Sequence, residues 1–307
     1  MFKIVTDSSA NLTNDLIRKY DIKIASLSYV IGSDLYSGVD AYSETSLKNF
    51  YARLRQKDDI TTSCANEEEF YELFKPLLES GNDVLYIGFS SALSATYKNA
   101  ALAAERLKKE YPARKIITVD SLLASLGEGL LVTTACQLKA DGKTIEEVAA
   151  ALESQKMNVN SLFTVKTLSY LCRGGRISKL NMCLGTVADI KPVMYVNEYG
   201  KLVSSGKVIG RKRSLAEIAK KVAANIISPE TQTIYISHGD SLDDAKLLAE
   251  MISKQVKVEG FLFNYVDPVI AVHSGPDTIA VFFYGNSRVK SAATEAVKSI
   301  NYGGAIN

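Results

Sequence analysis

The sequence predicts an α/β protein of two domains, an N-terminal α/β domain with a parallel sheet and a C-terminal α+β domain with a mixed sheet of roughly six strands. In the first half, short apolar runs alternate with amphipathic stretches of helical period, which is typical of parallel strands covered by helices. In the second half strand patterns become more frequent, and Asn197-Glu198-Tyr199-Gly200 has the turn chemistry of a hairpin. We therefore expect domains at residues 1–157 and 158–290, followed by a tail or short helix at 291–307.

Composition narrows the class of protein. The chain has 307 residues, 47% of them hydrophobic, which is enough for two ordinary cores. A net charge of +2 creates no global field that would attract nucleic acid or an anionic membrane. No apolar run approaches the length of a membrane span, and the first five residues have a strand pattern, unlike a signal peptide. We expect neither a nucleic-acid partner nor integral membrane association.

The numbers and spacing of the cysteines and histidines indicate whether a metal site is expected and in which cellular compartment the protein works. The two histidines, His238 and His273, lie far apart in the sequence, so a structural zinc site is not expected and no cofactor is indicated. The cysteines form no CxxC pair, which is typical of free thiols in a reducing cytoplasm. They are Cys64, Cys136, Cys172 and Cys183. We therefore expect a cytoplasmic protein.

In the N-terminal half, strands are expected where apolar runs are bounded by turn residues. These strands are 3–5, 22–31 (a strand or hairpin arm), 84–89 and 115–119. Helices are expected over 14–20, from 43 to about 55, from 66 to 81, from 96 to about 111, over 124–140 and from 144 to about 156. The alternation of the two element types predicts a parallel sheet with helices on both faces.

Capping residues support several of these helices. Ser43 is expected to cap one helix, and Asn66 another, with Glu69 three residues later. Thr144 with Glu147 has the pattern of a capping box.

Two glycines, Gly127 and Gly129, stand near the start of the helix at 124–140, where glycine lowers helix stability. They predict a close approach of the backbone to a neighbouring element or to a ligand.

In the C-terminal half, strands are expected at 159–165, 192–196, 201–209, 233–237, 260–266 and 278–284. Helices are expected over 214–226 and 242–256. The stretch from Leu168 to Ser178 predicts a short helix closed by Gly174-Gly175, followed by the start of a second helix.

Hydroxyl clusters follow three strands or precede helices, at residues 6–9, 61–63 and 90–96. Ligands of open α/β sheets bind at the carboxyl ends of strands, and a helix start favours a negative oxygen. The stretch 84–97 predicts a strand, a serine loop and a helix, with Ser90, Ser91, Ser94 and Thr96 as hydroxyl donors. It lacks the Gly-rich run and lysine of a phosphate loop, so a carboxylate fits better than a polyphosphate. The alternative is that Ser91 or Ser94 only caps the helix.

Other motifs have competing interpretations. Ser94 and His273 could form a nucleophile and base with Asp7 or Asp120 as the orienting carboxylate, although no G-x-S-x-G motif is present. His238 after a strand is more typical of a satisfied turn residue than of a phosphoryl acceptor. The basic run 211–213 could contact a partner, or it could be a solvated turn before a helix.

The clusters taken together resemble the DegV family. The resemblance runs in order from about residue 3 to about residue 285. The motifs that carry it are Thr6-Asp7-Ser8-Ser9, Thr62-Ser63, Ser90-Ser91-Ala92-Leu93-Ser94-Ala95-Thr96-Tyr97, Asp120-Ser121, Leu171-Cys172-Arg173-Gly174-Gly175-Arg176-Ile177 and His273-Ser274-Gly275-Pro276. Two positions depart from the family pattern. Ala95 stands where glycine is usual, and Cys64-Ala65-Asn66 follows the Thr-Ser motif where a proline is usual.

The resemblance implies a lipid-binding protein of two α/β domains. It implies that the chain binds a long-chain fatty acid with the carboxyl at the domain junction, and that a partner fatty acid kinase then forms the acyl phosphate. Thr62 and Ser94 would hydrogen-bond the carboxyl, with His273 close by, and Arg173 and Arg176 would order the adjacent loop or face the partner. The expected ligand-binding residues are Thr62, Ser63, Ser91, Ser94, Thr96, His273 and Arg173.

A carrier of this kind needs an apolar tunnel but no catalytic residue. The expected tunnel residues lie next to the serine loop: Ile87, Phe89, Leu93, Leu122, Leu126, Phe163, Ile270 and Val272. A serine hydrolase acting on acyl esters remains the alternative to a non-catalytic carrier.

Overall fold

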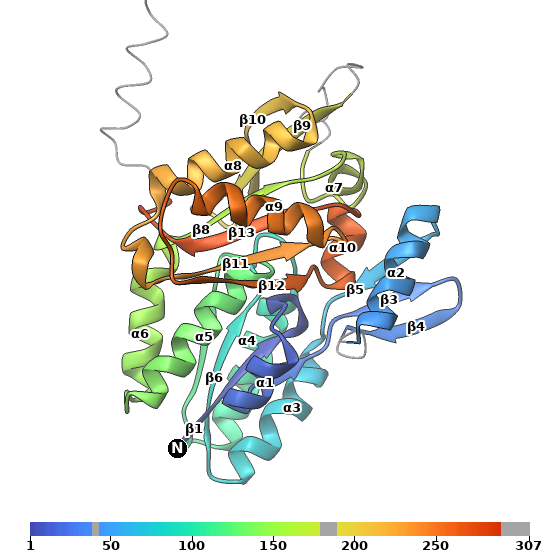
Figure 1. Cartoon of the computed structure of the whole chain (residues 1–307). Helices are drawn as coiled ribbons and strands as arrows, with labels where there is room; N and C mark the ends of the chain where they lie inside the picture. Colours follow the sequence, from blue (N-terminus) through green and yellow to red (C-terminus); the bar gives the residue numbers. More distant parts are fainter. Residues whose placement is uncertain (39–42, 179–188, 290–307) are drawn as a thin grey trace, which may run out of the picture.

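The computed structural model describes residues 1–38, 43–178 and 189–289. Its N-terminal half contains a four-stranded parallel sheet in the order β2-β1-β6-β7 (Figure 1). The strands are β1 (Phe2–Asp7), β2 (Lys23–Ala25), β6 (Asp83–Gly88) and β7 (Ile116–Asp120). The parallel sheet that the sequence predicts is therefore confirmed.

Helices cover both faces of this sheet. One face packs against α1 (Asn14–Tyr20), α5 (Leu126–Ala140) and α6 (Ile145–Gln155), and the other against α3 (Glu67–Glu79) and α4 (Thr96–Glu110). The capping boxes at α3 and α6 are present as expected, with Asn66 paired to Glu69 and Thr144 to Glu147. No helix of the described residues is both long and apolar enough to cross a membrane.

A small antiparallel sheet forms an arm that the sequence did not predict. It joins β3 (Ser28–Ile31), β4 (Asp34–Ser37) and β5 (Ile60–Ser63), and α2 (Glu44–Gln56) accompanies it. Ser43 caps α2, as expected. The single element expected at 22–31 is wrong, because β2 and β3 belong to different sheets. The break falls at Leu27, whose backbone N–H donates to Ser8 Oγ at 3.1 Å.

The C-terminal half contains a six-stranded mixed sheet in the order β10-β9-β8-β13-β11-β12. Its strands are β8 (Val159–Thr164), β9 (Ile190–Val196), β10 (Leu202–Ile209), β11 (Thr233–His238), β12 (Gly260–Tyr265) and β13 (Ile279–Tyr284). The β9–β10 hairpin turns at 197–200, as its sequence predicts. The helices are α7 (Ser169–Arg173), α8 (Arg211–Asn225), α9 (Leu242–Ser253) and α10 (Pro268–Ser274).

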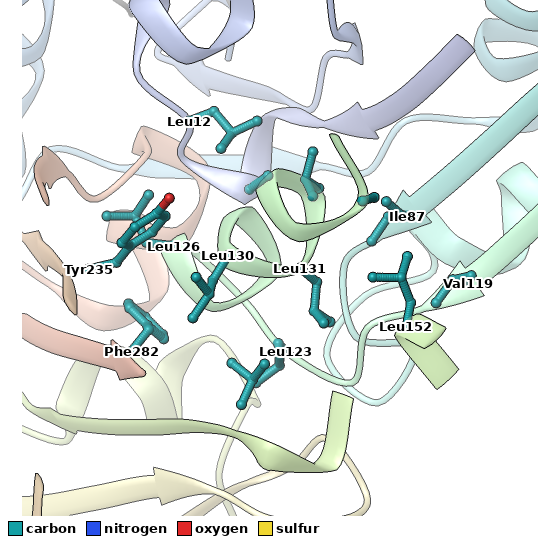
Figure 2. Close-up of a cluster of buried hydrophobic side chains, with 14 of the residues drawn as sticks. Leu12, Ile87, Val119, Leu123, Leu126, Leu130, Leu131, Leu152, Tyr235 and Phe282 are labelled. Carbon is teal, nitrogen blue, oxygen red and sulfur yellow. The ribbon is translucent and has the colours of Figure 1, made fainter. Parts of the chain in front are cut away.

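Helix α5 is the middle layer between the two large sheets (Figure 2). Leu126 and Leu130 lie toward Tyr235 and Phe282, whereas Leu131 lies toward the parallel sheet. The outer face of the six-stranded sheet packs against α8 and α9. One hydrophobic cluster thus spans both halves of the chain, so the domain division at 157–158 stays a prediction, and the expected tail at 291–307 lies outside the described residues.

The two glycines of α5 allow close packing. A Cβ on Gly127 would lie 2.7 Å from Phe282 Cδ1, and a Cβ on Gly129 would lie 2.5 Å from the carbonyl oxygen of Ala10. Both contacts bring α5 close to neighbouring elements, which confirms the first of the two expectations.

Two further segments are the apolar run before His273 and the residues after Gly175. The apolar run before His273 was assigned no secondary structure, and it forms α10, with Asp267 as its N-cap. A second helix is expected to start after Gly175, but residues 176–178 form no helix, and 179–188 lie outside the described residues. Cys64, Cys136 and Cys172 are free thiols, and Cys183 lies outside the described residues.

Candidate functional site

A cavity of about 430 Å³ lies where the serine loop after β6, strand β5, helix α10 and the six-stranded sheet meet. The sheet residues that face it follow from strand alternation and register. Ser161 on β8 pairs with Phe282 on β13, and Phe163 pairs with Ala280. These residues form, with two from the β9–β10 hairpin, a mostly apolar floor: Ser161, Phe163, Val196, Leu202, Ala280 and Phe282.

One end of the cavity is polar. Thr62 Oγ1 on β5 lies 2.8 Å from His273 Nε2 on α10, so the arm and the C-terminal half meet here. Burial, and to a smaller degree the charges of Arg176 and Arg173, lower the pKa of His273 to about 4. The imidazole is therefore neutral at pH 7, and its Nδ1 has no hydrogen-bond partner among the described residues.

The loop after α7 closes over this histidine. A Cβ on Gly174 would lie 2.2 Å from His273 Nδ1, so only glycine allows the observed approach. Arg176 donates from Nε to the carbonyl oxygen of Leu93 at 3.3 Å and from Nη1 to that of Gly174 at 2.5 Å. The loop thus brings a guanidinium group into the polar end of the cavity.

Arg176 lines the cavity, whereas Arg173 does not. The Arg173 guanidinium carbon lies 5.1 Å from the ring centroid of Tyr170. Arg173 instead lines a separate basic depression with Arg55, Lys57 and Lys166.

The serine loop places Ser94 at the cavity. The N-cap of α4 is Ala95, which makes no side-chain capping bond. Ser94 Oγ accepts from the Thr96 N–H at 3.2 Å and lies 2.8 Å from Thr96 Oγ1. Ser94 therefore holds the first turn of α4 and lines the cavity at the same time.

Four of the expected ligand-binding residues line the cavity, namely Thr62, Ser63, Ser94 and His273. The others do not. Ser91 is exposed, and its N–H donates to Asp120 Oδ1 at 3.2 Å. Thr96 is buried beneath Ser94, and Arg173 lies in the basic depression.

The serine loop is anchored by Asp7 at the end of β1 and by the β9–β10 turn. Asp7 Oδ2 accepts from the Tyr86 hydroxyl at 2.7 Å and from the Phe89 N–H at 3.1 Å. Burial raises the pKa of this carboxyl. Ser90 Oγ donates to the carbonyl oxygen of Gly200 at 3.0 Å, which joins the loop to the β9–β10 turn. Asp7 therefore supports the loop that carries the site.

No described carboxylate hydrogen-bonds His273. Asp7 is engaged by the serine loop, and Asp120 Oδ1 accepts from the N–H groups of Ser91 and Leu122. Ser94 bonds to Thr96, whereas His273 bonds to Thr62. Ser94, His273 and a carboxylate therefore do not form the hydrogen-bonded triad that a serine hydrolase requires.

The remaining motifs have structural explanations. His238 is buried, which lowers its pKa to about 4, and its Nδ1 accepts from the Ser241 N–H at 3.3 Å, as expected for a satisfied turn residue. Arg211 does not lie in a solvated turn, and a partner contact of the run 211–213 stays a prediction. Arg211 begins α8, and its Nε lies 2.8 Å from Asp244 Oδ2. Lys212 and Arg213 beside it are exposed.

The apolar lining was predicted in part. Phe89, Leu93, Phe163 and Ile270 line the cavity. The expectation is wrong for the others, because they pack elsewhere or do not reach it: Ile87, Leu122, Leu126 and Val272. Sequence reasoning left Cys64, Ser274 and the floor residues Ala280 and Phe282 unassigned. The alternation of strand 278–284 could have indicated the last two.

The chain is similar to known proteins along most of its length. The family model described as "Uncharacterised protein, DegV family" matches residues 1–286. A DegV domain-containing protein of Clostridium perfringens is 40% identical over 288 residues, covering 94% of this chain and 98% of that protein. Another, of Streptococcus pyogenes, is 32% identical over 288 residues, covering 94% of this chain and 99% of that protein.

Solved structures share the fold. A DegV family protein from Thermus thermophilus, described for its fatty acid binding, is 31% identical with a TM-score of 0.82, covering 92% of this chain and 99% of that one. A DegV lipid-binding protein from Thermotoga maritima is 27% identical with a TM-score of 0.81, covering 94% of this chain and 100% of that one. The sequence motifs, the fold and these matches together show that the chain belongs to the DegV family.

Proposed function

We propose that this protein binds a long-chain fatty acid, with the acyl chain in the cavity and the carboxyl at its polar end. The observation that carries the proposal is the cavity itself, which combines an apolar floor with Thr62, Ser94, His273 and Arg176 at one end. Fatty acid binding by the relative from Thermus thermophilus and lipid binding by the relative from Thermotoga maritima support it. Each buried methylene contributes about 0.8 kcal/mol, so about a dozen would supply ~10 kcal/mol before the costs of association.

The polar end suits a carboxylate that is held and later released. Hydroxyls of Thr62 and Ser94 and a neutral His273 offer uncharged hydrogen bonds, and Arg176 adds a positive charge. Arg176 already donates to two backbone carbonyls, so the carboxylate does not receive a free bidentate guanidinium. This chain is proposed as a carrier without catalysis of its own.

Removing the Ser94 hydroxyl is expected to weaken fatty acid binding by about 1.5–3 kcal/mol, the scale of one hydrogen bond to a charged group. Ser94→Ala should also lower the melting temperature slightly, because Ser94 accepts from the Thr96 N–H. Titration with a fluorescent fatty acid and a melting curve measure the two effects. Ser91→Ala is the matched control, since Ser91 is a loop serine outside the cavity. A lower melting temperature with unchanged affinity would leave Ser94 a capping residue only.

We further propose that the protein presents its fatty acid to a kinase that forms the acyl phosphate. The basic depression supports this proposal. Arg173 there is exposed, and the depression lies beside the loop that covers His273. An acidic partner surface would be drawn to such a patch.

Charge reversal at Arg173 should slow acyl phosphate formation by a fatty acid kinase and reduce the salt dependence of that rate. Affinity for the fatty acid should stay unchanged. Lys109→Glu makes the same charge change at an exposed position of α4 and serves as the control. Equal rates for Arg173→Glu, Lys109→Glu and the unmodified protein would show that the depression is not the docking surface.

A further inference from the structure

Besides Ser274 and Thr278, which follow His273 in the chain, two buried serines line the cavity. Ser161 is 4% exposed and lines the cavity, and its hydroxyl has no hydrogen-bond partner among the described residues. Ser125, at the start of α5, is 5% exposed and also lines the cavity. Neither belongs to the polar end with Thr62 and His273. Buried hydroxyls are nearly always paired, so the Ser161 hydroxyl calls for a physical explanation.

The surroundings of Ser161 are apolar. Strand alternation puts Ser161 and Phe163 on one face of β8, and the register places Phe282 and Ala280 beside them on β13. None of these neighbours has a side-chain group that could accept or donate a hydrogen bond. A plain methylene chain in the cavity would leave this hydroxyl without a partner.

Ser125 has an unused hydrogen-bonding capacity as well. Its Oγ lies 2.7 Å from Ser237 Oγ on β11, and one hydrogen bond between two hydroxyls uses only one of their two protons. The backbone of Ser125 has φ 56° and ψ −149°, a region that glycine almost alone adopts. A serine held there, where glycine would be relaxed, points to a use for its side chain.

We infer that the cavity binds fatty acids that carry an oxygen on the acyl chain, a hydroxyl or keto group, which hydrogen-bonds to Ser161 or, at another chain position, to Ser125. This inference rests on the proposed function and adds the class of acyl chain. The register of β8, β13 and β11 places Ser161 two strands away from Ser237, the partner of Ser125, so each serine meets a different part of the acyl chain. At either serine a chain hydroxyl donates or accepts, and a keto oxygen accepts. A site with buried polar groups discriminates strongly against ligands that leave those groups unpaired.

The test measures dissociation constants for stearate and for a series of stearates with one hydroxyl at successive positions. The hydroxystearate whose hydroxyl reaches Ser161 should bind about tenfold more tightly than stearate, the factor expected of one additional buried hydrogen bond. Ser161→Ala should remove this preference, so that the variant binds that hydroxystearate and stearate with similar affinity. Thr164→Val is the matched control. Thr164 is also a buried β8 residue with an unpartnered hydroxyl, but it lies three positions further along the strand and so on the opposite face.

A second variant guards against misfolding. Ser125→Gly removes the other hydroxyl and relaxes the backbone, but it also leaves Ser237 Oγ without its partner. The variant should therefore stay folded and lose the preference at the chain position that reaches Ser125. The inference is overturned if every hydroxystearate binds more weakly than stearate and Ser161→Ala changes no ratio. The two hydroxyls would then hold water, and fatty acid binding itself would stand. Failure of stearate and of the whole series to bind would overturn both proposals.

Discussion

Replacing Ala280 by phenylalanine is expected to abolish tight fatty acid binding while the protein stays folded. Ala280 lies on the cavity floor beside Phe163, and the cavity of about 430 Å³ has room for a phenyl ring. The ring would displace several methylenes of the ligand. Since each contributes about 0.8 kcal/mol, affinity should fall on the order of a hundredfold or more.

Dissociation constants for acids of increasing length, together with melting temperatures, measure this effect. Ala280→Val is the graded control, because its smaller side chain should cost less affinity and should affect the longest acids first. The melting temperature of Ala280→Phe should not fall, because the ring enters empty space. Unchanged affinity in Ala280→Phe would place the acyl chain outside this cavity.

Asp267 is expected to make the protein less stable as the pH rises. This carboxyl caps α10, the helix that carries His273, by accepting from the Ile270 N–H at 3.0 Å. Burial raises its pKa from 3.8 to about 7. The native state therefore keeps a proton that the unfolded state has lost. Stability from this group is full below about pH 4 and is lost as the pH rises to about 7, by about 4 kcal/mol at most.

The variant Asp267→Asn separates this effect from other buried acids. Asparagine caps helices as well as aspartate but does not ionise. Asp7 and Glu128 also have pKa values raised by burial, so the pH dependence of the unmodified protein alone does not identify Asp267. Urea unfolding at pH 5 and pH 8 should show that the stability of Asp267→Asn relative to the unmodified protein is greater at pH 8 than at pH 5. A difference that is the same at both pH values would contradict the assignment.

Elements whose ends are marked by capping or turn residues close together in the sequence were predicted correctly. Asn66 and Glu69 encode the start of α3 within four residues, and 197–200 encodes the hairpin turn in the same way. The arm could not be predicted, because the break at Leu27 depends on the Ser8 side chain from a distant part of the chain. Helix α10 had a readable start in Asp267-Pro268, but its short apolar run gives no clear period.

The sequence predicted those site residues that lie at the end of a strand or just before a helix. Thr62 and Ser94 line the cavity as expected. The choice between Arg173 and Arg176 could not be made from spacing. It depends on how Gly174 lets the loop pack against His273, which is a tertiary contact. The position of Ser161 on the cavity floor could not be predicted either, because it depends on the register of β8 with β13.

Native mass spectrometry of the protein purified from bacteria tests the central claim most directly. We expect the mass of about one free fatty acid per chain, without any fatty acid added and lost on denaturation, because the acyl chain supplies ~10 kcal/mol before association costs. A mass shift that survives denaturation would indicate an acyl-enzyme on Ser94 and the hydrolase alternative. A protein that emerges empty and takes up no added fatty acid would contradict the account.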